Sequence, residues 1–145
     1  MAQNIHGTTV DINGVGVLII GRSGSGKSDL ALRLILNKNA LLVSDDQTIL
    51  ERQKNQIKAY PPKSIAGLLE VRGIGIMKFP YTQTNLCMVV DVSPENKIER
   101  LPLPEFYHFE NTVLPLIKLN AFEASSPDKI VVKLKAVLEE KNFKE

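Results

Sequence analysis

Hydrophobic positions divide the start of the chain into segments of strand and helix length. Residues 15–20 (VGVLII) form an apolar run of strand length, and residues 28–36 (SDLALRLIL) have the composition of a stable helix. The stretch from Thr8 to Ile12 favours a strand, and Asn13-Gly14 is a strong signal for a hairpin turn. We therefore expect an antiparallel hairpin that leads into a strand, a loop and a helix. This hairpin would hold His6 level with the loop.

Apolar and β-prone segments between turn signals predict further strands. They cover residues 40–46, 48–52, 56–60, 86–92, 107–110 and 113–119. Residues 64–69 favour a helical turn, and three prolines within residues 93–105 indicate an irregular excursion. A final helix is expected from Ser125 or Ser126, where serine, proline and aspartate follow one another. Its apolar face comprises Ile130, Leu134, Val137 and Leu138.

Length and composition predict a globular protein. The 145 residues suffice for one domain with its own core, so we expect residues 1–145 to form a single α/β domain. A net charge of +2 does not favour nucleic acid or membrane as a partner. Cys87 is the only cysteine, which excludes an internal disulfide. Because no apolar run approaches membrane length and no leader pattern is present, we expect a cytoplasmic protein.

The segment between the predicted strand and helix matches the phosphate-binding pattern G-x-x-x-x-G-K-[ST] at every fixed position. In such a loop, successive N–H groups hold phosphate oxygens, and the positive end of the following helix faces the same phosphates. Lys27 adds a full charge, and the Ser28 hydroxyl is placed to bind Mg²⁺. A glycine- and serine-rich turn without a ligand is the alternative. The predicted nucleotide-binding residues are Gly21, Arg22, Ser23, Gly24, Ser25, Gly26, Lys27 and Ser28.

Three other groups are candidates for the same site. Asp45 and Asp46 end a strand that we expect to lie parallel beside the loop, where carboxylates can hold Mg²⁺; a turn or cap is the alternative. Residues 70–76 (EVRGIGI) are typical of either a functional loop or an amphipathic edge strand. His6 is either part of the site or a surface histidine near the terminus. His108, in an aromatic setting, is expected to serve packing or lie on the surface.

Four of these segments, in this order, resemble the HPr kinase/phosphorylase family. They are His6-Gly7, Gly21 to Ser28, Val43-Ser44-Asp45-Asp46 and Glu70 to Ile76. The last is the most discriminating, because many families have a phosphate loop. The resemblance covers about residues 5–92 and is closest to the short alphaproteobacterial form. It implies a phosphate-loop mixed sheet like that of ATP-dependent phosphoenolpyruvate carboxykinase, flanked by helices, and often a homo-hexamer.

The resemblance implies a kinase that uses ATP and Mg²⁺ to phosphorylate a serine of HPr, the phosphocarrier of the sugar phosphotransferase system. Asp45 resembles the general base that takes the serine proton. Lys27 and the loop amides would hold the triphosphate and neutralise its charge. Ser28 and Glu70 match the magnesium ligands, and His6 matches a catalytic histidine.

Two more residues are expected to support this site: Asp46, by assisting the metal through water, and Arg72, by contacting phosphate or holding Glu70. The chain departs from longer family members in residues 115–123, which contain Lys118 but not the arginine tied to dephosphorylation. We therefore predict a kinase for HPr or a related carrier; the resemblance also implies phosphorylase activity, which the missing arginine argues against. A nucleotide-binding regulator with little or no catalysis is the alternative, and a small-molecule kinase fits the pattern less well.

Overall fold

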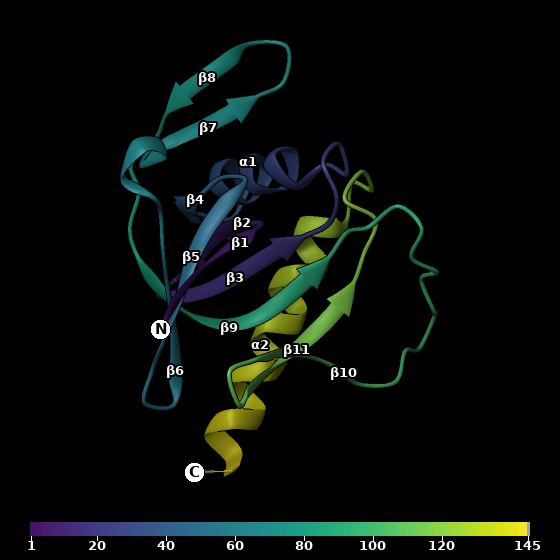
Figure 1. Cartoon of the computed structure of the whole chain (residues 1–145). Coiled ribbons are helices and arrows are strands. Elements are labelled where there is room, and N and C mark those ends of the chain that lie inside the picture. The colour runs from purple at the N-terminus through teal and green to yellow at the C-terminus, as the bar shows by residue number, and fades with distance from the viewer. Residues whose placement is uncertain (145) are drawn as a thin grey trace.

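The computed structural model describes residues 1–144, with side chains through residue 140. A curled mixed sheet forms the body of the protein, and helices pack against it (Figure 1). The strands are β1 (Ala2–His6), β2 (Thr8–Ile12), β3 (Val15–Ile20), β4 (Leu41–Ser44), β5 (Gln47–Gln53), β6 (Gln56–Tyr60), β7 (Leu68–Val71), β8 (Gly75–Lys78), β9 (Thr84–Asp91), β10 (Glu105–Phe109) and β11 (Thr112–Lys118). The helices are α1 (Lys27–Asn37), the 3₁₀ turn η1 (Lys63–Ile65) and α2 (Ser126–Lys144).

Strand β3 lies near the middle of the sheet, whose order is β1-β5-β6-β9-β3-β2-β4. It pairs antiparallel with β2 and parallel with β9, and β9 also pairs parallel with β11. The predicted hairpin is confirmed: Asn13 and Gly14 both have positive φ, as a tight two-residue turn requires. The carboxyl end of β3 therefore delivers the glycine-rich loop to one edge of the central sheet.

One expectation about the neighbours of the loop was wrong. Strand β4 runs in the same direction as β3 but does not pair with it, because β2 lies between them. The parallel neighbour is β9, in which Asp91 is level with Ile20. The predicted strand Thr8–Ile12 is confirmed as β2; before it, the chain turns at Gly7, and β1 pairs with β5. A side chain at Gly7 would collide with Leu18, since its Cβ would lie 2.8 Å from Leu18 Cδ1.

The core has two parts, one on each face of the sheet. Neighbouring residues of β3 alternate between them: Val17 and Ile19 join the first cluster and Leu18 the second. Helices α1 and α2 cover the first cluster, to which Ile130 and Leu134 contribute as predicted. No helix within the described part of the chain is long and apolar enough to span a membrane.

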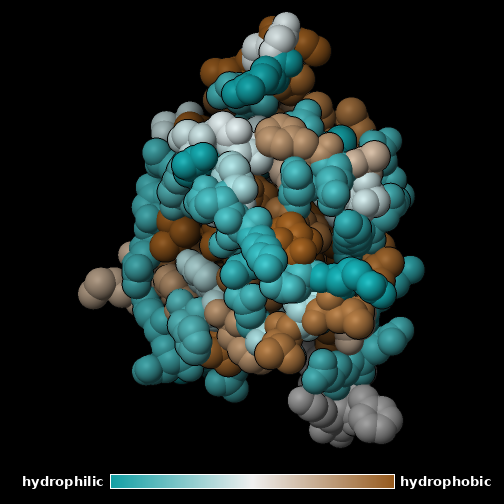
Figure 2. Space-filling model, turned by 90° about the vertical axis from the view of Figure 1, so that its right-hand side faces the viewer, coloured by the Kyte–Doolittle hydropathy of each residue, from teal (hydrophilic) through white to brown (hydrophobic). Residues whose placement is uncertain are grey.

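The segment with the EVRGIGI pattern forms a hairpin of its own. Strands β7 and β8 make a separate two-stranded sheet that projects from the body, at the top of Figures 1 and 2. The expected helical turn over residues 64–69 is limited to η1, and Leu68 already begins β7. Ile74 and Ile76 are 71% and 67% exposed, and apolar side chains colour this projection in Figure 2. The segment is therefore not an edge strand of the main sheet.

The other hairpins lie where the turn signals predicted them. β5 and β6 pair around Lys54, and β10 and β11 pair around Glu110 and Asn111, one residue before the expected turn. Residues 93–104 form no strand or helix, as their prolines predicted.

Candidate active site at the glycine-rich loop

The loop from residue 21 to 26 connects β3 to α1 and needs glycine at three positions. Gly21, Gly24 and Gly26 have φ of 152°, 83° and 93°, positive values that other residues rarely adopt. Gly26 also lies against the segment after β11, because a Cβ there would be 3.0 Å from both Ala121 Cβ and the Phe122 ring. The sequence pattern thus corresponds to a backbone shape that a larger residue would disturb.

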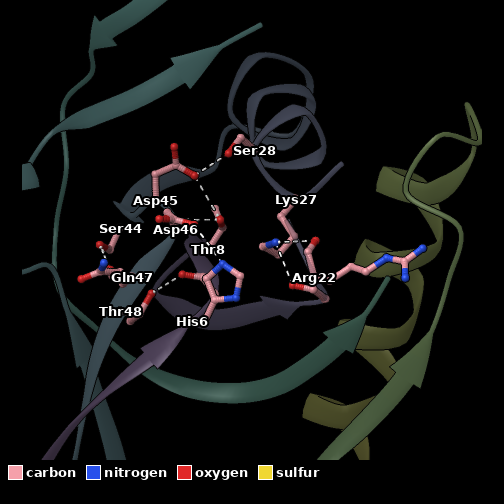
Figure 3. Close-up of polar contacts among 12 residues, drawn as sticks. His6, Thr8, Arg22, Lys27, Ser28, Ser44, Asp45, Asp46, Gln47 and Thr48 are labelled. Atoms are coloured by element: carbon pink, nitrogen blue, oxygen red, sulfur yellow. Dashed lines mark hydrogen bonds and ion pairs between the residues drawn. The ribbon is translucent and has the colours of Figure 1, made fainter. Parts of the chain in front are cut away.

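Lys27, the first residue of α1, points back into this loop. Its Nζ donates to the carbonyl oxygens of Gly21 (2.8 Å) and Arg22 (3.0 Å) (Figure 3). The side chain is buried, and burial lowers its pKa from the usual 10.5, although the charges of Asp46 and Asp45 act in the opposite direction. The structure therefore holds a partly desolvated cation inside the loop, where an anion would relieve its loss of water.

Asp45 joins four separate elements through one carboxylate. Its Oδ1 accepts hydrogen bonds from Ser28 Oγ (2.6 Å) and Thr8 Oγ1 (3.1 Å), and its Oδ2 accepts one from the Glu70 backbone N–H (3.1 Å). The residue is only 7% exposed. The carboxylate consequently lies beside the first turn of α1, and three donors fix its orientation.

Asp46 faces a different partner. The turn between β4 and β5 gives it a φ of 66°, and its backbone N–H donates to Thr8 Oγ1 (3.1 Å). Its Oδ1 lies 3.0 Å from His6 Nε2, and both side chains are largely solvent-accessible (Figure 3). The two adjacent aspartates therefore differ in their surroundings, because the tight turn directs their side chains to different partners.

Some predicted site residues do not join this cluster. Glu70 contributes its backbone N–H, while its side chain is exposed. Arg72 lies exposed in the turn of the β7–β8 hairpin and forms no hydrogen bond or ion pair within the described residues. Arg22 points away from Lys27 in Figure 3, toward Glu95, with which it pairs at 3.6 Å. His108 is exposed on β10.

Two neighbours of the site escaped the sequence analysis. The Thr8 hydroxyl donates a hydrogen bond to Asp45 and accepts one from the backbone N–H of Asp46. A threonine in a strand, however, carries no sequence signal for a functional role. Asp91 ends the strand beside β3, and its Oδ1 accepts from both the N–H (2.9 Å) and the Oγ (2.6 Å) of Ser93. Its place at a strand end was visible in the sequence, but its proximity to the loop depends on sheet order.

The residues present fit a triphosphate with magnesium. Ser28 Oγ and the Asp45 carboxylate are hard oxygen donors beside the loop. No group of three or more His, Cys, Asp or Glu side chains among the described residues could hold a metal ion alone. Mg²⁺ is usually held by one or two protein oxygens together with phosphate oxygens and water, and Ser28 with Asp45 provides oxygens of this kind.

A mixed sheet with a glycine-rich loop ahead of a helix defines a class of α/β proteins with a candidate phosphate site. The family model of the HPr Serine kinase C-terminal domain matches residues 1–131, so the chain belongs to this family. The resemblance of the four motifs is thereby confirmed.

Individual relatives agree with this family. The HPr kinase/phosphorylase of Shouchella clausii (strain KSM-K16) is 37% identical over 112 residues, which are 70% of this chain and 36% of that protein. The chain thus matches little more than a third of the length of this relative. The solved structure of the Hpr(Ser) kinase/phosphatase from Coxiella burnetii has a TM-score of 0.78 and 26% identity, covering 98% of this chain and 97% of that chain. This similarity confirms the predicted mixed α/β fold.

Proposed function

We propose that this protein is an ATP- and Mg²⁺-dependent kinase that phosphorylates a serine of HPr or a related phosphocarrier. One observation carries the proposal: Lys27 and the Asp45–Ser28 pair (2.6 Å) lie together at the glycine-rich loop. Membership of the HPr kinase family and the printed names of its relatives support the choice of substrate. We also propose a single domain, residues 1–145, that acts in the cytoplasm as a homo-oligomer.

The loop and Lys27 would bind the triphosphate. The Lys27 ammonium donates hydrogen bonds to two backbone carbonyls, which are weaker partners than phosphate oxygens. The first N–H groups of α1 and the positive end of its dipole face the same space. Ser28 and Glu70 would hold Mg²⁺, which supplies charge neutralisation to the phosphates when bound.

Asp45 is the proposed general base. The serine oxygen would form a bond to the γ-phosphorus as the bond to the bridging oxygen of ADP breaks, and the serine proton would pass to Asp45. Only partial proton removal is needed, because phosphoryl transfer has a loose transition state. His6 and Asp46, 3.0 Å apart, would support the acceptor side of the site. Arg72 would reach the phosphates only if its hairpin moved.

The proposal does not include phosphorolysis. Lys118, the cation in the segment where longer family members carry an arginine, pairs with Glu105 at 3.3 Å. A competing possibility is a regulator that binds nucleotide without transferring phosphate. The convergence of a lysine, a hydroxyl and a buried carboxylate at one loop favours catalysis over binding alone.

The test is a transfer assay with the purified chain, ATP, Mg²⁺ and HPr from the same organism. Mass spectrometry should find one phosphoserine on HPr, and transfer should stop with EDTA or with Lys27→Met. Arg52→Met, in the exposed part of β5, is the matched control and should keep full activity. Nucleotide binding without phosphoserine would support the regulator and refute the kinase.

A further inference from the structure

A cavity of about 150 Å³ opens beside the glycine-rich loop, on the side of the segments that follow β9 and β11. Its lining residues are Ser25, Val92, Ser93, Pro94, Asn96, Ile98, Leu119, Asn120 and Phe122. Ser25 belongs to the loop itself. Gly21, where the loop begins, lies against the same wall, because a Cβ there would be 3.2 Å from Val92 Cγ2. The cavity therefore borders the loop of the candidate phosphate site.

The chemistry of the walls selects a neutral aromatic ligand. No charged side chain lines the cavity, so neither a phosphate nor a metal ion would find a counter-charge there. The walls combine apolar groups with amides and hydroxyls, which suits a ring that carries hydrogen-bonding edges. Cavities of roughly this volume accommodate an aromatic ring.

Unused hydrogen-bonding groups face this space. Ser25 is 1% exposed, and its Oγ has no hydrogen-bond partner among the described residues, an unfavourable state for a buried hydroxyl. Asn120 uses its Oδ1 to accept from the Phe122 N–H (2.9 Å), which leaves its amide nitrogen available. Asn96 uses its Nδ2 to donate to the Asp91 carbonyl (3.3 Å), which leaves its amide oxygen available. The cavity therefore offers both a donor and an acceptor.

The geometry points to this cavity as the binding site for the purine base of the nucleotide whose phosphates occupy the loop. The base edge presents donors and acceptors, which Asn96 and Asn120 can match. The Phe122 ring lines the cavity, and its Cε1 and Cζ atoms lie beside Gly26 of the loop, so one wall adjoins the phosphate site. This inference rests on the proposed function, because it requires that the loop bind a nucleotide.

The test compares ATP with inorganic tripolyphosphate, which has the phosphates but no base. Calorimetric titration of the wild-type chain should show tighter binding of ATP. Phe122→Ala should weaken ATP binding by about 5- to 150-fold, the effect of losing one base–aromatic stack, and leave tripolyphosphate binding unchanged. Phe106→Ala is the matched control: Phe122 is 64% exposed and Phe106 is 54% exposed, but Phe106 does not line the cavity.

Other results would overturn the inference. The inference fails if Phe122→Ala and Phe106→Ala bind ATP with equal affinity. It also fails if the wild-type chain binds ATP no more tightly than tripolyphosphate. If Phe122→Ala weakens both ligands because its ring also supports Gly26, then Ile98→Ala decides. Compared with Leu101→Ala, which alters the same segment outside the cavity, Ile98→Ala must weaken the binding of ATP and leave the binding of tripolyphosphate unchanged. If the two variants bind ATP with equal affinity, the base site is refuted. If the wild-type chain binds neither ligand, the proposed function fails as well.

Discussion

Replacing Asp45 by asparagine removes the charge at the centre of the site while keeping the size of the side chain. The asparagine oxygen can still accept from Ser28 and Thr8, as Oδ1 does now. The amide nitrogen would then face the Glu70 N–H in place of Oδ2, and a donor would meet a donor. One buried N–H left without an acceptor costs about 1–3 kcal/mol, so we expect the free energy of unfolding in urea to fall by about that amount.

The same substitution tests the role of Asp45 in catalysis. Removing a positioned general base typically costs about 10²–10⁴-fold, so the rate of serine phosphorylation should drop by that factor at saturating ATP. Asp46→Asn is the matched control for stability, and Asp128→Asn, an exposed residue of α2 outside the site, is the matched control for the rate. Asn tolerates the positive φ of 66° at the position of Asp46, and the change there removes one exposed contact with His6, worth about 0–1 kcal/mol.

The rate of phosphorylation tests the role of Asp45 as the base, and the free energy of unfolding tests its role in stability. If Asp45→Asn keeps a tenth or more of the wild-type rate, Asp45 is not the base. If it loses no more stability than Asp46→Asn, the three hydrogen bonds to the carboxylate do not stabilise the fold as argued.

Three further predictions address the loop and the core. Gly26→Ala should abolish tripolyphosphate binding in calorimetry and lower the melting temperature, because it combines a φ of 93° with a Cβ 3.0 Å from Ala121; retained affinity would contradict the loop argument. Burial lowers the pKa of Lys27, so its ammonium is lost below pH 10.5. Tripolyphosphate affinity should therefore fall as the pH is raised toward that value, whereas Lys27→Arg should show no such fall. Because the pKa of Lys27 is lower in the folded than in the unfolded chain, the folded protein binds fewer protons at this residue between the two pKa values. The contribution of Lys27 to the free energy of unfolding therefore rises with pH in that interval. Leu134→Ala, at a position 4% exposed between α2 and the sheet, should cost about 2–5 kcal/mol in urea denaturation with little change in phosphate affinity; a cost near zero would place α2 outside the core.

The sequence alone determined the features that depend on neighbours along the chain. The hairpin through Asn13-Gly14, the loop between residues 20 and 27, and helix α1 all follow from turn residues and from the spacing of apolar positions. The order of the family motifs indicated the family, because each motif is a short stretch whose residue types are required locally. The prediction that the hairpin holds His6 level with the loop also has a local origin, because it follows from the turn at Asn13-Gly14.

Only the tertiary structure decided which strand ends lie together. A strand pattern does not specify its partner, so the expectation that β4 lies beside β3 was wrong, and the sheet places β9 there. The hydrogen bonds from Thr8 and Ser28 to Asp45 join residues 37 and 17 positions apart, and they depend on the packing of α1 against the sheet. Phe122 reaches Gly26 for the same reason. Side chains brought together by long-range packing leave no periodic trace in the sequence, and the base cavity consists almost entirely of them.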